Sequence, residues 1–144
     1  MDLMFAELEN EMPRGVLPSV PDTSCPSPSI LIVEDEAFVR LLGADTLAHA
    51  GFRVIEAGDG KEALAFLEAD SDVQLLLTDV NLTGILDGLA LAQQVHERWP
   101  RIGIIVVSGQ ASPQPHELPP GSHFHRKPYD ADAVIRHARE LTTA

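Results

Sequence analysis

The chain has 144 residues, of which 44% are hydrophobic and 22% are charged, so it is long enough for one globular domain with a packed core. Its formal net charge of -12, without a basic stripe, argues against nucleic acid and anionic membranes as direct partners. A single cysteine, Cys25, excludes an intramolecular disulfide, and no apolar run approaches the roughly 20 residues of a membrane-spanning helix, so we predict a cytoplasmic protein.

Residues 1–29 are predicted to form a flexible, proline-rich tail. Five prolines lie between residues 12 and 28 among serine, aspartate and glycine, and such a segment cannot form a packed element. Residues 3–11 mix apolar and acidic side chains and could form one short amphipathic helix, which is marginal in water on its own. Disorder is the interpretation we favour for the tail, a docking peptide is the alternative, and residues 30–144 form the predicted domain.

The first half of this domain alternates between short strands and longer helices. The apolar run Ile30–Val33 predicts a strand, and apolar residues at spacings of three, four and seven predict a helix over Ala37–Ala50. The alternating segment Phe52–Glu56 predicts a second strand. A helix start signal follows at Asp59, and the apolar run Val73–Leu77 predicts a buried central strand.

The second half continues the same alternation. Asp87–Arg98 predicts a third helix, which a proline ends, and Asp130–Leu141 predicts the last helix. Ile102–Val107 and His123–Arg126 predict the last two strands. Four prolines within residues 109–121 leave room there for only a short or irregular helix. The whole order predicts a parallel sheet between two layers of helices.

Polar residues that can bind phosphate or metal follow four of the predicted strands. Glu34 and Asp35 follow the first strand, Asp79 the third, Ser108 the fourth and Lys127 the fifth. In open α/β sheets the ligand crevice lies outside the carboxyl ends of the strands, so these side chains should converge on one rim. Phosphoryl transfer to a carboxylate needs a nucleophile, a divalent cation and fixed groups that bind the phosphoryl oxygens. This set of residues supplies a nucleophilic aspartate, carboxylate ligands for the cation, and a hydroxyl and an ammonium for the phosphoryl oxygens.

In this order and spacing, the residues resemble the receiver domain of bacterial two-component response regulators. The resemblance covers nearly all of residues 30–144 and implies a flavodoxin-like doubly wound five-stranded parallel sheet, strand order 2-1-3-4-5. Since the chain stops soon after the last helix, we expect a stand-alone receiver without a DNA-binding output domain. The chain departs from the family where Thr83 replaces the usual proline, and the loop after Asp79 is one residue longer.

The resemblance makes Asp79 the phosphoacceptor. A Mg2+ ion, with Mn2+ as an alternative, would bind the carboxylates of Glu34, Asp35 and Asp79. By resemblance, the backbone carbonyl of Asn81 would be a further ligand. Three carboxylates and the ammonium of Lys127 carry a formal charge of about -2, so without the ion at least one carboxyl pKa should rise.

Lys127 and the hydroxyl of Ser108 would bind phosphoryl oxygens and complete the catalytic set with Asp79. In the family, this hydroxyl moves toward the phosphoryl group and an aromatic residue three positions before the lysine turns inward, which here is Phe124. The acyl phosphate would then shift a two-state equilibrium of the surface formed by residues 109–126 and the last helix.

These residues predict a signalling protein of a two-component system or phosphorelay. It would not be an enzyme with a separate substrate, because it catalyses only phosphoryl transfer to and from its own Asp79. The phosphodonor would be a sensor histidine kinase or a histidine phosphotransfer protein, and the downstream partner an unknown protein. One alternative is a receiver-fold interaction module that is not phosphorylated. A second, a Mg2+-dependent phosphatase of the haloacid dehalogenase class, requires an Asp-x-Asp motif after the first strand, whereas Asp79 is followed by Val-Asn.

His123 and His125 lie two residues apart on one predicted strand. This spacing can bind a transition metal, but without other ligands nearby in the sequence it does not predict a site.

Overall fold

The fold is described from a computed structural model, in residues 27–69, 72–110 and 112–142. Within these ranges the strands are β1 (Ser29–Val33), β2 (Arg53–Ala57), β3 (Val73–Asp79), β4 (Gly103–Ser108) and β5 (His123–Arg126). The helices are α1 (Ala37–His49), α2 (Gly60–Ala69), α3 (Gly88–Arg98), the 3-10 helix η2 (Pro115–Glu117) and α4 (Ala131–Thr142). All strand pairs are parallel and the sheet order is β2-β1-β3-β4-β5, so the predicted fold class is confirmed.

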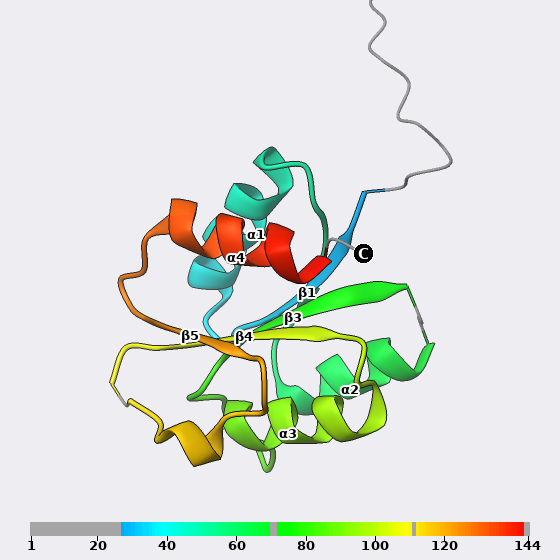
Figure 1. Ribbon diagram of the computed structural model, residues 1–144, viewed down its shortest axis with the longest axis vertical. Coiled ribbons are helices and arrows are strands. Elements are labelled where there is room, and N and C mark those ends of the chain that lie inside the picture. Colours follow the sequence, from blue (N-terminus) through cyan, green and yellow to red (C-terminus); the bar gives the residue numbers. More distant parts are fainter. Residues whose placement is uncertain (1–26, 70–71, 111, 143–144) are drawn as a thin grey trace, which may run out of the picture.

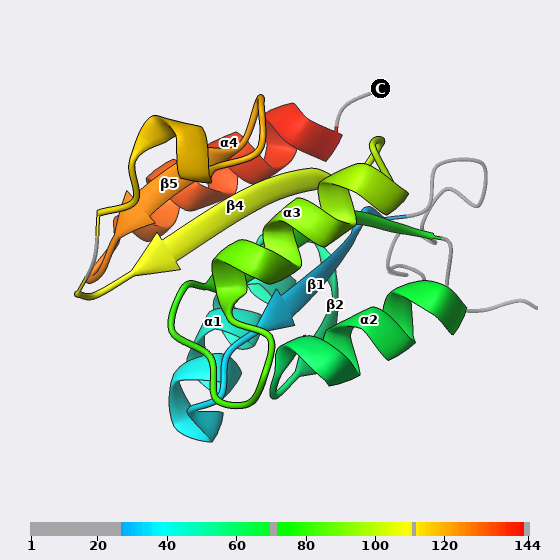
Figure 2. The same cartoon turned by 90° about the horizontal axis from the view of Figure 1, so that it is seen from below.

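The helices form two layers around the sheet. Helices α1 and α4 cover one face, and α2 and α3 cover the other (Figure 1). Figure 2 shows the α2 and α3 side, with β5 at the edge of the sheet beside α4. Strands covered on both faces read as nearly continuous apolar runs, and all five residues of β1 are buried.

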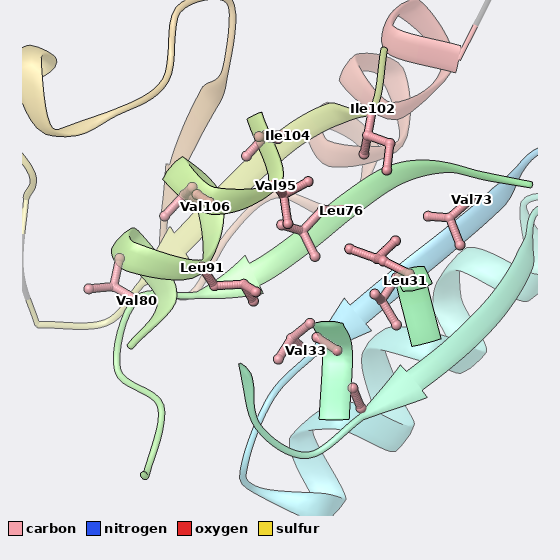
Figure 3. Close-up of a cluster of buried hydrophobic side chains, with 14 residues drawn as sticks. Leu31, Val33, Val73, Leu76, Val80, Leu91, Val95, Ile102, Ile104 and Val106 are labelled. Carbon is pink, nitrogen blue, oxygen red and sulfur yellow. The ribbon is translucent and has the colours of Figure 1, made fainter. Parts of the chain in front are cut away.

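The core beneath α2 and α3 joins three neighbouring strands. Leu31, Leu76 and Val106 come from β1, β3 and β4 and are fully buried (Figure 3). Leu91 and Val95 of α3 pack against them at a spacing of four, as the sequence predicted for that helix. This packing fixes where β3 ends, and therefore where the residues after β3 lie.

Helix α1 has the predicted position, but its largest apolar residues do not face the core. Phe38, Leu41 and Leu42 are 68%, 56% and 53% exposed, although their spacing helped to predict the helix. The buried face is formed by Gly43, Ala44 and Leu47. A Cβ on Gly43 would lie 2.8 Å from Cδ1 of Ile32, so the small residues allow α1 to approach β1 closely. An apolar period therefore located the helix but not its buried side.

The connection between β4 and β5 matches the expectation of a short or irregular helix. In its described residues, 109–110 and 112–122, the only helix is the three-residue η2, where Glu117 Oε1 accepts a hydrogen bond from the backbone N–H of Gln114 at 2.7 Å. Most of the predicted tail lies outside the described residues, and Ser29, its last residue, is the first residue of β1. Among the described helices, none is both long and apolar enough to cross a membrane.

Candidate functional site

The strand register brings the polar residues that follow the strands to one edge of the sheet. Val33 pairs with Thr78, so Glu34 and Asp79 are the next residues on neighbouring strands. Ser108 pairs with Arg126, the residue before Lys127. The carboxyl ends of β1, β3, β4 and β5 therefore meet, as expected for an open parallel sheet.

Lys127 joins two buried carboxylates. Its Nζ lies 2.8 Å from Oε1 of Glu34 and 3.0 Å from Oδ2 of Asp79. Glu34 is only 5% exposed and Asp79 only 7% exposed. Burying a charge costs free energy unless it is paired and hydrogen-bonded, so one ammonium shared by two carboxylates stabilises both.

Backbone groups hold the other carboxylate oxygens. The N–H of Glu36 donates to Oε2 of Glu34 at 3.2 Å, and the N–H of Asn81 donates to Oδ1 of Asp79 at 3.2 Å. Arg40 of α1 donates from Nη1 to the backbone carbonyl of Glu34 at 2.8 Å, which fixes the turn after β1. The two carboxylates therefore have set orientations before any ligand binds.

The ionisation of the site follows from burial and pairing. Burial raises the pKa of Glu34, with repulsion from Asp79 adding to it, although the hydrogen bond from Lys127 opposes the shift. Burial alone would lower the pKa of Lys127, but its hydrogen bonds to Glu34 and Asp79 outweigh that effect and raise it. One carboxyl pKa is raised, as expected, but burial contributes more to the shift than the repulsion between carboxylates from which the rise was predicted.

Asp35 completes a set of oxygen donors that suits a hard divalent cation. One oxygen from each of Glu34, Asp35 and Asp79 can be chosen so that all three lie within 4.8 Å of one another. Carboxylate oxygens in such a cluster fit Mg2+, which binds proteins through a few carboxylates and keeps several waters. The residues present therefore fit the metal that the sequence predicted.

Ser108 and Phe124 differ in their relation to this edge. Ser108 is completely buried, and its Oγ accepts a hydrogen bond from the N–H of Gln110 at 3.3 Å. Phe124 pairs with Val106 in the sheet and is partly buried against the core beneath α2 and α3. The structure thus brings Ser108 to the carboxyl edge and places Phe124 three residues before Lys127 in the body of β5.

Two supporting residues were missed by the sequence analysis. The backbone N–H of Thr83 donates to Oδ2 of Asp35 at 3.0 Å, so the loop after β3 reaches across to β1. A proline at position 83 has no N–H and cannot make this bond. The substitution of proline by threonine was visible in the sequence, but its partner was not. Nothing in the sequence marked Arg40 as the residue that holds Glu34.

A doubly wound parallel sheet with an acidic cluster and a lysine at its carboxyl edge defines a receiver-type signalling domain. The family described as response regulator receiver domain matches residues 30–117 of this chain. The chain therefore belongs to the response regulator receiver family of two-component signalling.

Relatives of known name agree with this assignment. The chain is 32% identical over 116 residues to the C4-dicarboxylate transport transcriptional regulatory protein DctD of Rhizobium meliloti, covering 78% of this chain and 25% of the relative. It is 31% identical over 111 residues to the sensor histidine kinase RcsC of Escherichia coli, covering 76% of this chain and 12% of the relative. The chain thus spans a quarter or less of these relatives, which are a regulator and a kinase.

Solved structures give the same fold. A response regulator receiver protein from Sinorhizobium medicae superposes with a TM-score of 0.77 and 28% identity, covering 82% of this chain and 96% of the other. The receiver domain of NtrX from Brucella abortus gives a TM-score of 0.71 and 31% identity, covering 78% and 97%.

Proposed function

We propose that this receiver domain accepts a phosphoryl group on Asp79 in a Mg2+-dependent reaction and signals through protein contacts. The observation that carries the proposal is the position of Asp79. It lies within hydrogen-bonding distance of Lys127 and beside the carboxylates of Glu34 and Asp35. A nucleophile, a cation site and a fixed positive charge thus occur together at one edge of the sheet. The cytoplasmic location stays a prediction.

Glu34, Asp35 and Asp79 would hold the Mg2+ ion, with the backbone carbonyl of Asn81 as a further ligand and Mn2+ as an alternative ion. When bound, the ion would neutralise negative charge on the phosphoryl oxygens. Lys127 must then exchange a carboxylate oxygen for a phosphoryl oxygen. Its Nζ is already 3.0 Å from Oδ2 of Asp79, so a small movement suffices.

In the transfer step, a carboxylate oxygen of Asp79 attacks phosphorus and forms the P–O bond of an acyl phosphate. The bond from phosphorus to the donor atom breaks, and its electron pair stays on the leaving group. Lys127 and the Ser108 hydroxyl would bind phosphoryl oxygens as negative charge is transferred. Hydrolysis of the acyl phosphate would return the free carboxylate of Asp79. The chain would therefore act only on its own Asp79 and not on a separate substrate.

We propose a protein as the phosphodonor, namely a sensor histidine kinase or a histidine phosphotransfer protein. A surface groove of about 460 Å³ between α1 and the segment after β5 is lined by Leu42, Lys127 and Pro128, among others. Phe38 and Leu41 are exposed on the same helix. Lys127 lines the groove and also contacts Asp79, so the groove is continuous with the proposed phosphoacceptor site.

The output would be a change of surface at β5 and α4, which an unknown partner protein reads. Ser108 and Phe124 are the proposed switch residues. Ser108 ends β4 and pairs with Arg126 of β5, and Phe124 lies two residues earlier on β5, so movement at the hydroxyl can reach β5 directly.

Phosphorylation can be tested on the purified chain with acetyl phosphate and Mg2+, followed by intact-mass measurement. We expect one labile phosphoryl adduct per chain, none after addition of a chelator, and NMR shifts around Ser108 and Phe124 on addition of beryllofluoride. If a folded chain forms no adduct and shows no shifts with Mg2+ present, the alternative of a receiver-fold module that is not phosphorylated takes the place of this proposal.

Replacement of Lys127 by Met should change metal affinity and phosphorylation in opposite directions. Without the ammonium, the carboxylates of Glu34 and Asp79 repel each other and attract cations more strongly, so Mg2+ should bind more tightly by on the order of tenfold. The same change removes a group that stabilises the transferred phosphoryl group, so phosphorylation by acetyl phosphate should slow by about a hundredfold.

Calorimetric titration with Mg2+ and the rate of adduct formation would measure the two effects. The matched control is Lys61→Met, because Lys61 is the only other lysine of the chain and lies exposed at the start of α2. Weaker Mg2+ binding in Lys127→Met than in the control would contradict the electrostatic account.

A further inference from the structure

Three histidines meet between β5 and α4, away from the carboxylates of the proposed phosphoacceptor site. His123 and His125 are two residues apart on β5, so their side chains lie on the same face of the sheet. His137 of α4 faces them. Its ring stacks on His123 with centroids 4.0 Å apart, and its Nδ1 lies 2.8 Å from Nε2 of His125.

An acidic residue completes this group. Glu140 follows His137 by three positions on α4, which places both on one side of the helix. One ligand atom each from His123, His137 and Glu140 lie within 4.8 Å of one another. The sequence analysis saw only the pair on β5, because the fold brings in the two residues of α4.

The chemistry of the group favours a metal ion. Two imidazole nitrogens and one carboxylate oxygen form a donor set that Zn2+ binds in proteins, whereas Mg2+ prefers oxygen ligands alone. The group and the carboxylates of Glu34 and Asp79 therefore differ in the metal that they select.

We propose that His123, His137 and Glu140 bind a Zn2+ ion that joins β5 to α4, with His125 as a positioning residue. The hydrogen bond between His125 Nε2 and His137 Nδ1 leaves Nε2 of His137 for the ion. A hydrogen bond to the second nitrogen of a ligating histidine fixes the orientation of its ring. Water or a partner's side chain would take the fourth position.

Binding requires a local rearrangement that the exposure of the group allows. The His123 and His137 rings are nearly parallel, with 15° between their planes, so their lone pairs do not point at a common centre. Ligand atoms around a tetrahedral Zn2+ ion are about 3.3 Å apart, so the three residues must close from their present separation. His125 holds the ring of His137, whereas His123 is partly exposed and Glu140 is exposed, so these two side chains can rotate toward Nε2 of His137.

Calorimetric titration with Zn2+ tests the proposal on the full chain carrying Cys25→Ser, which removes the only thiol, in excess Mg2+ to occupy the carboxylate cluster. We expect one ion per chain and a rise in the unfolding temperature, since an ion that binds only the folded state stabilises it. A titration with Co2+ should give the intense visible absorption of a tetrahedral site.

Variants separate this site from other histidines. His137→Gln and Glu140→Gln should each abolish the tight site, and His125→Gln should weaken it by about 10-fold to 100-fold because it only orients His137. The control is His116→Gln, which changes an exposed histidine on η2. Glu140 is exposed, so loss of binding in Glu140→Gln does not reflect unfolding.

The proposal is overturned if the Cys25→Ser chain binds no Zn2+, or if Glu140→Gln and His137→Gln bind it as tightly as the His116→Gln control. The proposal is supported if His137→Gln and Glu140→Gln lose Zn2+ binding while the His116→Gln control keeps it. Because the readout is metal binding, these outcomes do not depend on phosphorylation of Asp79.

Discussion

Replacement of Asp79 by Asn is expected to abolish formation of the phosphoryl adduct. The amide is not a nucleophile toward phosphorus, and the variant also loses one of the three carboxylates that would hold Mg2+. The single amide oxygen can keep only one of the two hydrogen bonds, which Asn81 and Lys127 donate to different oxygens of Asp79, but this loss is offset because repulsion with Glu34 is relieved. The free energy of unfolding should therefore change by no more than about 1 kcal/mol.

Intact-mass measurement with acetyl phosphate and Mg2+ gives the first quantity, and urea unfolding gives the second. Asp132→Asn is the matched control, because it makes the same chemical change at an exposed position in the first turn of α4. A full adduct in Asp79→Asn would place the acceptor at another residue and refute the proposed role of Asp79.

Replacement of Gly88 by Ala is expected to destabilise the fold strongly, by about 3 kcal/mol. A Cβ at this position would lie 1.8 Å from the backbone oxygen of Asp79 and 2.8 Å from Cα of Val80. These are backbone atoms, so they cannot move aside as the end of a side chain could. The N–H of Gly88 also donates to the carbonyl of Val80 at 2.9 Å, which holds the start of α3 against the end of β3.

Urea unfolding of Gly88→Ala measures this loss, and the same shift of backbone should slow phosphorylation because it displaces Asp79. Gly58→Ala is the control, since the nearest atoms to its Cβ are the ends of two flexible side chains at 3.5 Å. The control should change stability by less than about 0.5 kcal/mol. Equal stability of the two variants would contradict this prediction, because it would show that the backbone of Asp79 and Val80 can move away from the added Cβ.

The sheet could be predicted well because parallel strands buried on both faces leave clear apolar runs in the sequence. The run Ile30–Val33 and the run Val73–Leu77 both proved to be central strands, with ends shifted by one or two residues. The buried face of α1 could not be predicted in this way. Gly43 and Ala44 face β1 because small residues let the helix approach the strand closely. The spacing of large apolar residues carries no information about how closely a helix approaches a strand.

The candidate site was predictable as a set because each residue directly follows a strand. The order of strands brings Glu34, Asp79 and Lys127 together without any further information. Contacts from other elements were not predictable. The bond from Thr83 to Asp35 and the approach of His137 to His125 depend on a loop path and on a helix position, which the sequence does not encode locally.

The close packing of α1 against β1 through small residues also has a consequence for hydrogen exchange. Among the large apolar residues of α1, Leu47 is buried, whereas α3 buries Leu91 and Val95. A helix with little buried apolar surface opens locally at a lower free energy, so backbone amides of α1 should exchange sooner than those of α3. Arg40 moves with α1, so each such opening would also release the carbonyl of Glu34. Binding events that order the site would thereby slow exchange in this helix.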